Sequence, residues 1–337
     1  MAREQRSSGD LREGLVVKIL VTGGAGFIGS NIARQLLARG DEVHILDDFS
    51  TGRREIIDEF RGSARTIEGD IRDLDACRAA CKGMDAILHL AALGSVPRSM
   101  EDPVTTHAVN VTGSLNMLLM ARECGVDRFV MASSSSVYGD TAVREKSEDL
   151  ASAPLSPYAS SKLAAESYTK VFKHAYGMNT VALRYFNVFG PYQDPQSQYA
   201  AVVPLFASAL IAGSSPTIFG DGGQTRDFTY VDNVVSANLL ALECPPESCG
   251  EAYNVACGQS VSVKELFEAM RQRLGGAAVA IEPRYEPPRK GDVRDSLASI
   301  AKVREGLRYE PLVSFEEGIA RTVDWYVETT SATSQPR

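Results

Sequence analysis

The sequence of 337 residues predicts a doubly wound α/β fold, in which a parallel sheet carries helices on both faces and a smaller C-terminal domain follows. Short apolar runs alternate with amphipathic helical stretches, which is typical of repeated βαβ units. The first run leads into a glycine-rich turn, and several later runs end in acidic, hydroxyl or amide side chains. In such sheets ligands bind beyond the carboxyl ends of the strands, so these side chains are candidates for one site.

The glycine-rich turn joins an apolar strand over residues 17–22 to a helical run over 31–39. Its glycines follow the spacing Gly23-x-x-Gly26-x-x-Gly29. This spacing permits a tight turn, lets bare backbone approach a pyrophosphate and lets the helix pack closely on the strand. Amide groups at the helix N-terminus then face the phosphates, so the turn predicts a dinucleotide site.

A second strand, residues 42–46, ends in Asp47 and Asp48, 18 residues after the last of these glycines. A carboxylate at this place can accept hydrogen bonds from the hydroxyls of an adenosine ribose. Asp47 would repel a 2′-phosphate, so the sequence favours NAD over NADP. Arg53 and Arg54 lie nearby and would have the opposite effect.

The alternation continues along the chain and then changes in character. The further predicted strands are 65–71, 85–92, 128–133 and 180–186, and the predicted helices are 74–81, 103–124 and 157–176. From about residue 188, prolines and the glycine-rich segment 219–223 interrupt shorter elements. Some later segments are expected to return to the first domain. The expected divisions are a disordered tail over 1–15, a dinucleotide-binding domain over 16–187, a substrate-binding domain over 188–330 and a second tail over 331–337.

Composition argues against several classes of function. Acidic residues outnumber basic ones by 43 to 35, a net charge of −8, which argues against a nucleic-acid-binding surface. The six cysteines and four histidines have no metal-ligand spacing, so we expect no metal site and reduced thiols, as in the cytoplasm. Residues 1–15 lack the apolar core of a signal peptide, and the longest apolar stretch, 200–212, is too short to span a bilayer. The sequence therefore predicts a cytoplasmic protein without a membrane segment.

A tyrosine and a lysine four residues apart, Tyr158 and Lys162, lie in the predicted helix 157–176. At this spacing the two side chains share one helix face, about 6 Å apart along the axis. A phenol has an ordinary pKa of about 10, and we expect the ammonium group and a positively charged nicotinamide to lower it. The strand 128–133 leads into four serines, Ser133 to Ser136, whose hydroxyls can bridge proton transfer to the tyrosine.

Three segments together resemble the extended short-chain dehydrogenases/reductases, which are built on a Rossmann sheet. They are Thr22-Gly-Gly-Ala-Gly-Phe-Ile-Gly29, the Ser-Ser-x-x-Val-Tyr-Gly segment that ends at Gly139, and Tyr158-x-x-x-Lys162. Within that family the chain resembles the UDP-hexose 4-epimerases over residues 17–327. The branch of UDP-N-acetylglucosamine 4-epimerases has similar segments to those at 93–99, 184–190, 199–204 and 291–296.

This resemblance implies the residues of a catalytic set, a cofactor site and a substrate site. Ser134 matches the catalytic serine, Tyr158 the base, and Lys162 the residue that holds the ribose and tunes the base. The residues implied to bind NAD are Gly23, Gly26, Phe27, Ile28, Gly29, Asp47, Asp48, Ser50, Gly52, Asp70, Ile71, Leu90, Ala91, Ala92, Asn110, Ser133, Tyr158, Lys162 and Tyr185. The residues implied to bind the UDP-sugar are Gly94, Ser95, Arg98, Ser134, Ser135, Asn187, Val202, Phe219, Arg226, Arg289, Asp292 and Ser296.

The implied reaction is 4-epimerisation of UDP-N-acetylglucosamine and UDP-N-acetylgalactosamine, with UDP-glucose and UDP-galactose as further substrates, through a transient 4-keto sugar on tightly bound NAD. Ser296 matches a position where epimerases restricted to non-acetylated hexoses have a tyrosine. The smaller side chain leaves room for a 2-acetamido group. In this family, the arginines that match Arg226 and Arg289 grip the diphosphate, since a guanidinium pairs with phosphate through two hydrogen bonds.

The sequence is compatible with several other functions. The main alternative is a 4-epimerase restricted to UDP-glucose. A UDP-glucuronate 4-epimerase or decarboxylase would need a partner for the C6 carboxylate, which Arg98 could supply. A 4,6-dehydratase would carry Asp-Glu where this chain has Ser135 and Ser136. A non-catalytic NAD sensor on the same fold could lose the tyrosine and lysine, which this chain keeps.

The two long predicted helices, 103–124 and 157–176, carry apolar residues on more than one side. One side packs on the sheet, and the other can meet a second chain. In the family that the chain resembles, such helices form a four-helix dimer interface. We therefore expect a homodimer that binds a UDP-sugar and has neither nucleic-acid nor membrane partners.

Overall fold

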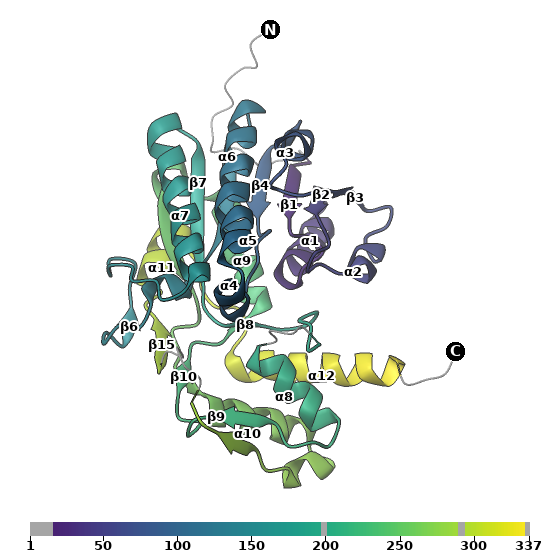
Figure 1. Cartoon of the computed structure of the whole chain (residues 1–337). Coiled ribbons are helices and arrows are strands. Elements are labelled where there is room, and N and C mark those ends of the chain that lie inside the picture. The colour runs from purple at the N-terminus through teal and green to yellow at the C-terminus, as the bar shows by residue number, and fades with distance from the viewer. Residues whose placement is uncertain (1–15, 197–200, 289–293, 334–337) are drawn as a thin grey trace.

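The computed structural model describes residues 16–196, 201–288 and 294–333. Its centre is a seven-stranded sheet in the order β12-β7-β5-β4-β1-β2-β3, in which each pairing is parallel (Figure 1). The strands are β1 (Lys18–Thr22), β2 (Glu42–Asp47), β3 (Ala64–Glu68), β4 (Ala86–His89), β5 (Arg128–Ser134), β7 (Asn179–Tyr185) and β12 (Glu251–Val255). The strand order reverses between β1 and β4, which is where a doubly wound sheet opens a crevice for ligands.

Helices cover both faces of this sheet because its strands are apolar on both sides. In β1, Ile19 and Val21 belong to one hydrophobic cluster, and Leu20 between them belongs to the other. One face carries α1 (Phe27–Arg39), α9 (Val231–Glu243) and α11 (Ala301–Leu307), and the other carries α3 (Leu74–Cys81), α6 (Ser114–Glu123) and α7 (Pro157–Tyr176). The predicted doubly wound α/β class is confirmed.

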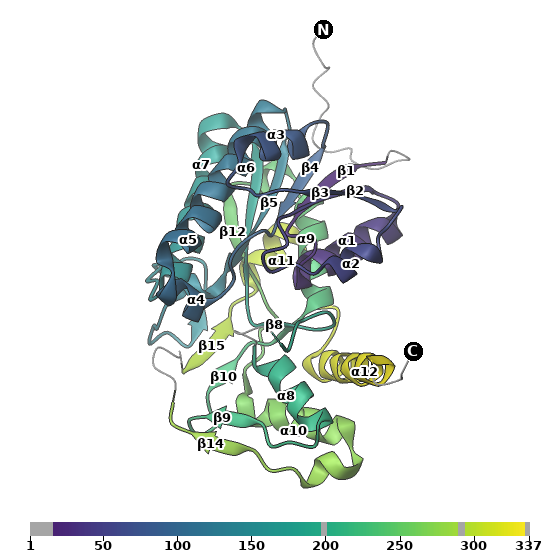
Figure 2. The same cartoon turned by 45° about the vertical axis from the view of Figure 1, so that its right-hand side comes forward.

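A second group of elements lies beyond the carboxyl ends of the strands (Figure 2). It holds a four-stranded sheet in the order β13-β10-β15-β6 and two pairs of short strands. The strands are β6 (Glu145–Lys146), β8 (Val188–Phe189), β9 (Thr217–Phe219), β10 (Thr225–Arg226), β11 (Thr229–Tyr230), β13 (Val261–Ser262), β14 (Arg284–Glu286) and β15 (Asp295–Ala298). The helices are α8 (Val202–Ile211), α10 (Val263–Leu274) and α12 (Phe315–Thr333).

The remaining elements are short and lie in connections. They are α2 (Arg54–Asp58), α4 (Val96–Glu101), α5 (Pro103–His107), the π-helical η1 (Ala108–Gly113), and the 3₁₀ turns η2 (Ser135–Tyr138), η3 (Pro246–Ser248) and η4 (Gly276–Ala280). Among the described residues, no helix is long and apolar enough to cross a membrane.

Three features differ from the sequence prediction. The sheet has a seventh strand, β12, which pairs with β7 although it lies far beyond residue 188. The helix predicted over 103–124 is divided into α5, η1 and α6, because the π-helical turn widens its middle. Helix α1 begins at Phe27, four residues before the predicted start, since the last glycine of the turn is already helical.

Candidate active site

The glycine turn brings the backbone of β1, α1 and β4 into close contact. Gly23 has a φ of +71°, and a Cβ built on it would lie 2.8 Å from the Ala91 amide nitrogen. A Cβ on Gly29 would lie 2.2 Å from the Gly23 carbonyl oxygen. Gly26 is the N-cap of α1 and makes no side-chain cap hydrogen bond, so the first amides of this helix need another acceptor. This arrangement fits an anionic ligand at the helix N-terminus.

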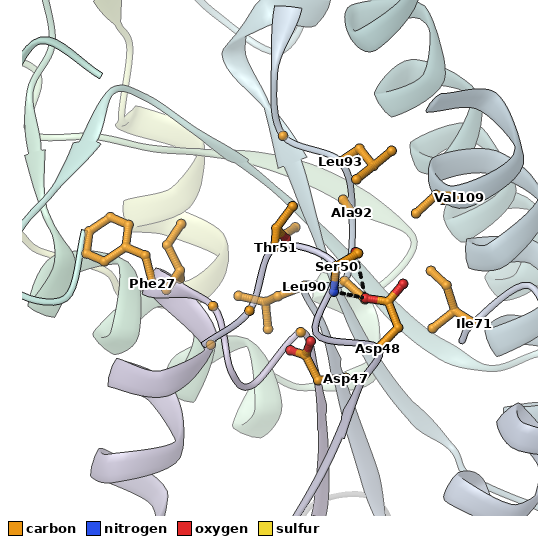
Figure 3. A pocket seen from close by; sticks show the side chains of 18 of the residues that line it. Phe27, Asp47, Asp48, Ser50, Thr51, Ile71, Leu90, Ala92, Leu93 and Val109 are labelled. Atoms are coloured by element: carbon orange, nitrogen blue, oxygen red, sulfur yellow. Dashed lines mark hydrogen bonds between the residues drawn. The ribbon is translucent and has the colours of Figure 1, made fainter. Parts of the chain in front are cut away.

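A cavity of about 370 Å³ follows the turn along the carboxyl ends of the strands (Figure 3). Of the predicted cofactor and substrate residues, those that line it are Gly23, Gly26, Phe27, Ile28, Gly29, Asp47, Asp48, Ser50, Gly52, Ile71, Leu90, Ala91, Ala92, Gly94, Ser133, Tyr158, Lys162 and Tyr185. Six lining residues were not predicted: Leu46, Thr51, Gly69, Leu93, Val109 and Ala132. Each of these six residues adjoins a predicted residue in the sequence, so inclusion of sequence neighbours would have found them.

Two acidic residues after β2 lie at this cavity. Asp47 is buried, and its carboxylate accepts hydrogen bonds from the amides of Ala25 and Phe49, each at 2.9 Å. Burial raises the pKa of Asp47, and the two amide hydrogen bonds act against that shift. Asp48 accepts from the amide of Ser50 at 2.9 Å and from its hydroxyl at 2.7 Å, as Figure 3 shows. Both carboxylates are held in place by the loop that follows them.

Two of the predicted cofactor residues lie outside the lining of this cavity. Asp70 forms a hydrogen-bonded ion pair with Arg72, which lowers the pKa of the Asp70 carboxyl. Asn110 is buried in η1, where it accepts from the amide of Leu93 at 2.8 Å and donates to its carbonyl at 3.1 Å. Asn110 thus holds the loop around Leu93, which lines the cavity, but Asn110 itself does not line it.

The tyrosine and lysine reach the cavity from α7. Ser156 accepts a hydrogen bond from the Ala159 amide and Pro157 occupies the first turn, so the helix starts immediately before Tyr158. The Lys162 ammonium donates to the carbonyl oxygen of Ala132 at 3.0 Å. Burial lowers the pKa of Lys162 to about 8.

The pKa of Tyr158 differs from the sequence expectation. Withdrawal of the phenol from water raises this pKa, although the side chain as a whole keeps some exposure. The Ser134 hydroxyl acts in the opposite direction, because a hydrogen bond to the phenolate stabilises it. The expected lowering by Lys162 is absent, since that ammonium is directed at the backbone of β5. Ser134 also accepts hydrogen bonds from the amide and the hydroxyl of Ser136.

A second cavity of about 540 Å³ lies among the elements beyond the sheet. The predicted substrate residues that line it are Asn187, Val202, Phe219 and Arg226. The Arg226 guanidinium donates to the carbonyl oxygens of Thr225 at 2.8 Å and Arg294 at 3.3 Å. Asn187 has a positive φ of 34°, and its amide donates to the carbonyl of Asp227 at 3.3 Å.

Other predicted substrate residues line neither of these two cavities: Ser95, Arg98, Ser134, Ser135 and Ser296. Ser95 caps α4 by accepting from the amide of Arg98 at 3.2 Å. Ser296 is buried in β15, opposite Arg226 of β10. Arg289 and Asp292 lie outside the described residues. Within the described ranges, no three histidine, cysteine, aspartate or glutamate side chains are grouped so that they could hold a metal ion.

Residues 19–256 match the protein family described as "NAD dependent epimerase/dehydratase family". The chain belongs to this family. The predictions of a nucleotide-sugar epimerase of the extended short-chain dehydrogenase/reductase type, of an enzyme and of NAD as its cofactor are confirmed.

Individual relatives cover nearly the whole described chain. A UDP-glucose 4-epimerase of Mycolicibacterium smegmatis is 40% identical over 314 residues, which are 92% of this chain and 98% of that protein. The crystal structure of a UDP-glucose 4-epimerase from Thermotoga maritima with UDP-glucose has a TM-score of 0.88 at 37% identity, over 93% of this chain and 100% of that one. A UDP-N-acetylglucosamine 4-epimerase from Methanobrevibacter ruminantium, in complex with UDP-N-acetylmuramic acid, has a TM-score of 0.87 at 38% identity, over 93% and 99%.

The residues of the first cavity fit NAD. Side chains at Gly23 and Gly29 would collide with the protein's own backbone, so glycine keeps this turn tight where both residues line the cavity. Such a turn lets the backbone approach a pyrophosphate. The start of α1, which lacks a side-chain cap, suits the pyrophosphate. Asp47 and Asp48 stand at the end of β2, where ribose hydroxyls are bound in this fold.

Proposed function

We propose that this enzyme epimerises UDP-sugars at C4, with UDP-N-acetylglucosamine and UDP-N-acetylgalactosamine as its preferred pair and UDP-glucose and UDP-galactose as further substrates. The observation that carries the proposal is the position of Tyr158 and Lys162 in the same cavity as the glycine turn. A proton acceptor and a nicotinamide site beside each other are what oxidation of a sugar hydroxyl requires. The 4-epimerase relatives named above support C4 as the reacting carbon.

In the proposed reaction, Tyr158 takes the proton of the C4 hydroxyl and later returns it, and Ser134 relays that proton. Bound NAD would supply the hydride acceptor, and in its reduced form the hydride donor, for C4 of the sugar. Lys162 holds the nicotinamide ribose. To do so, its ammonium must either break the hydrogen bond to the Ala132 carbonyl or donate to that carbonyl and the ribose together. The transient 4-keto sugar turns over between the two transfers, so the sugar is held more loosely than the UDP.

The second cavity is the proposed place of the UDP end. Arg226 and Asn187 line it, together with the aromatic rings of Phe219 and Phe228. A guanidinium is suited to a diphosphate, and aromatic rings are suited to a pyrimidine. These contacts would be the same before and after epimerisation, as the proposed reaction needs.

The proposal is tested by incubating the full chain separately with UDP-N-acetylglucosamine, UDP-glucose and UDP-glucuronate, followed by chromatographic separation of the C4 epimers. We expect conversion of the first two and none of the third. Tyr158→Phe should lower kcat at least ~100-fold, since it removes the proton acceptor. The control is Tyr176→Phe in the same helix, at a half-exposed position outside both cavities, which should keep wild-type turnover. Wild-type turnover in Tyr158→Phe would overturn the assigned base.

The preference for acetylated sugars rests on the small side chain at position 296. Ser296→Tyr should reduce kcat/KM for UDP-N-acetylglucosamine at least ~10-fold more than for UDP-glucose, because a phenol would take the volume proposed for the acetamido group. Equal losses on both sugars would contradict this role of Ser296 and leave epimerisation itself unaffected.

Conversion of UDP-glucose alone would support the restricted epimerase, and conversion of UDP-glucuronate would support the epimerase or decarboxylase that uses Arg98. A 4,6-dehydratase would release water and form a 4-keto-6-deoxy sugar, for which Ser135 and Ser136 offer no carboxyl group. NAD occupancy without turnover of any UDP-sugar would support a sensor. The six free cysteines fit the reducing cytoplasm that the sequence predicts.

A further inference from the structure

A pair of cysteine thiols lies in contact on the side of the sheet that α9 covers. Cys244 directly follows α9, and Cys249 comes shortly before β12. Their sulfur atoms are 3.8 Å apart, and both residues are buried, with exposed fractions of 4% and 7%. Neither cysteine lines the two cavities described above, and neither is used in the proposed reaction.

A buried arginine connects the two sulfur atoms. Nη1 of Arg128, the first residue of β5, donates to each sulfur at 3.1 Å. The same nitrogen is 3.3 Å from the Ala241 carbonyl oxygen, and Nη2 donates to the Cys244 carbonyl oxygen at 2.8 Å. These acceptors carry no formal charge while both thiols are protonated. A buried guanidinium favours a neighbouring negative charge, and here a thiolate can supply it.

We infer that Cys244 and Cys249 form a redox-active dithiol, which a peroxide or a small-molecule disulfide converts into a reversible intramolecular disulfide. The sulfur atoms need to approach by less than 2 Å to reach the bonding distance of about 2.05 Å. A metal ion is a poor alternative occupant, because the positive charge of Arg128 lies against both sulfurs and the described residues offer no group of three metal ligands here.

The chemistry of this pair assigns different roles to its two members. A hydrogen bond from Cys249 lowers the pKa of Cys244, against the effect of burial, and the charge of Arg128 adds to the lowering. The same hydrogen bond and burial raise the pKa of Cys249, although Arg128 and the Lys173 ammonium act against this. Arg128 lies 3.1 Å from both sulfurs and can stabilise a thiolate on either. We assign the attack to Cys244, the thiol whose pKa is lowered, and the resolving role to Cys249, and the substitutions below test this assignment.

The reaction with hydrogen peroxide balances in two steps. The Cys244 thiolate attacks one peroxide oxygen, so an S–O bond forms, the O–O bond breaks and hydroxide leaves as water after protonation. The Cys249 sulfur then attacks the sulfenic sulfur, so the S–S bond forms, the S–O bond breaks and the hydroxide leaves with the Cys249 proton as a second water. Two thiols are oxidised and one peroxide is reduced to two waters.

A matched internal control is present in α3. Cys77 and Cys81 are also buried, and they are four residues apart where Cys244 and Cys249 are five apart. Among the hydrogen bonds of the described residues, none runs from an arginine to their sulfurs. Burial raises the pKa of Cys77 to about 12 and also raises that of Cys81. These thiols should stay protonated near neutral pH and react slowly with peroxide.

The test treats the reduced, folded full chain with hydrogen peroxide at pH 7, alkylates all remaining thiols after denaturation and maps peptides by mass spectrometry. We expect the peptide 227–264 to lose two hydrogens and to carry a single alkyl group, on Cys257, and we expect dithiothreitol to restore three alkyl groups. Disulfide formation should be at least ~10-fold faster than any oxidation of Cys77 or Cys81. An equal or slower rate, or a disulfide that includes Cys257, would overturn the inference.

Two single substitutions test the assigned roles without removing the arginine. Cys249→Ser should leave a sulfenic acid on Cys244 that dimedone traps, whereas Cys244→Ser should give no comparable adduct on Cys249. The reverse pattern, or no adduct in either variant, would refute the assignment of Cys244 as the attacking thiolate. These readouts are masses, so they are independent of the proposed epimerase activity.

Discussion

At the scale of single residues, Gly29 is a position where steric contact determines how a substitution changes stability and NAD binding. It lies in α1, and in an unobstructed helix alanine is about 1 kcal/mol more stable than glycine. Here the added Cβ would stand 2.2 Å from the Gly23 carbonyl oxygen, so the turn would have to open. Steric conflict therefore outweighs helix propensity at this residue.

We predict that Gly29→Ala lowers the affinity for NAD at least ~10-fold and lowers the melting temperature, measured by calorimetric titration and differential scanning calorimetry. Gln35→Ala, at an exposed position of the same helix, is the control and should leave the affinity for NAD unchanged. A more stable Gly29→Ala variant with unchanged affinity would mean that the turn has room for the methyl group.

His89 is a second residue whose surroundings fix its chemical state. Its Nδ1 lies 2.8 Å from the Thr22 hydroxyl, and its Nε2 lies 2.9 Å from the Ser114 hydroxyl. Ser114 donates its own proton to the Asn110 carbonyl at 2.6 Å, so it can only accept from Nε2. Nδ1 must then accept from Thr22, and the ring is neutral with its proton on Nε2. Burial, and next the charge of Lys162, lower the pKa of His89 to about 3.

This neutral histidine predicts a specific loss of stability in acid. The unfolded chain binds a proton at His89 below about pH 6.5, whereas the folded protein does so only near pH 3, so stability falls as pH decreases through this window. The full effect is up to about 5 kcal/mol. Urea unfolding of wild type and His89→Asn from pH 7 to pH 4 should show the variant less stable at pH 7, with the difference shrinking in acid. A difference that stays constant with pH would refute the assignment.

At the scale of elements, α7 aligns three functional side chains at intervals of four residues. Tyr158 and Lys162 reach the cavity, and Glu166 lies one turn further on. The Glu166 carboxylate accepts from the Ser133 hydroxyl at 2.8 Å and from two nitrogens of Arg184 at 3.0 and 2.7 Å. Burial opposes the charge of Glu166, but the bonds from Arg184 and Ser133 bring its pKa below the ordinary value. This ion pair joins α7, β5 and β7 next to Ser134, the proposed catalytic serine.

Glu166→Ala should therefore destabilise the protein by about 3–5 kcal/mol, because it leaves the Arg184 guanidinium buried without its counter-charge. Lys170→Ala removes a partly exposed partner of the same carboxylate, 3.7 Å away, and should cost less than about 1 kcal/mol. Urea denaturation of both variants measures the two costs. The double variant Glu166→Ala/Arg184→Met should recover much of the loss, and a double variant as unstable as Glu166→Ala would indicate that packing rather than charge is responsible.

The success of the sequence prediction differs between elements for physical reasons. Helix α7 has the predicted bounds because its signals are local: Ser156 and Pro157 at its start and Gly177 in the left-handed conformation at its end. The π-helical turn η1 contains Asn110, whose hydrogen bond with Leu93 spans 17 residues. A local sequence pattern does not predict such a contact. Strand β12 is five residues long and, among the described strands, pairs with β7 alone, so its place in the sheet is decided by tertiary packing.

The candidate site also has features that the sequence predicts and features that it does not. The glycine turn, the acids after β2 and the tyrosine–lysine pair were predictable because each is a local motif at the end of a strand or the start of a helix. The raised pKa of Tyr158 was not predictable, because it comes from burial of the phenol by residues of other elements. The hydrogen bond from Lys162 to the Ala132 carbonyl likewise depends on another element. The placement of Ser296 beside Arg226 likewise depends on the pairing of two short strands that are distant in sequence.

At the scale of the whole molecule, the outer surface of α5, η1, α6 and α7 is the place where we predict a second copy of the chain to bind. These helices run side by side on one flank of the sheet (Figures 1 and 2). They expose large apolar side chains: Val104 is 76% exposed, Val171 48% and Tyr168 38%. Because burial of apolar area stabilises association, this flank favours a four-helix interface between two protomers.

The double variant Tyr168→Glu/Val171→Glu would bring four carboxylates into that interface, two from each protomer, where desolvation and mutual repulsion oppose association. Light scattering at micromolar concentration should give twice the chain mass of 36.4 kDa for wild type and the single mass for the variant. The control is Leu312→Glu, which alters an apolar residue that is 68% exposed outside these helices and should remain dimeric.

A monomeric wild type would contradict the predicted dimer, and a dimeric double variant would place the interface on another surface. Neither Tyr168 nor Val171 lines the cavity that fits NAD, so a monomeric variant should keep its NAD.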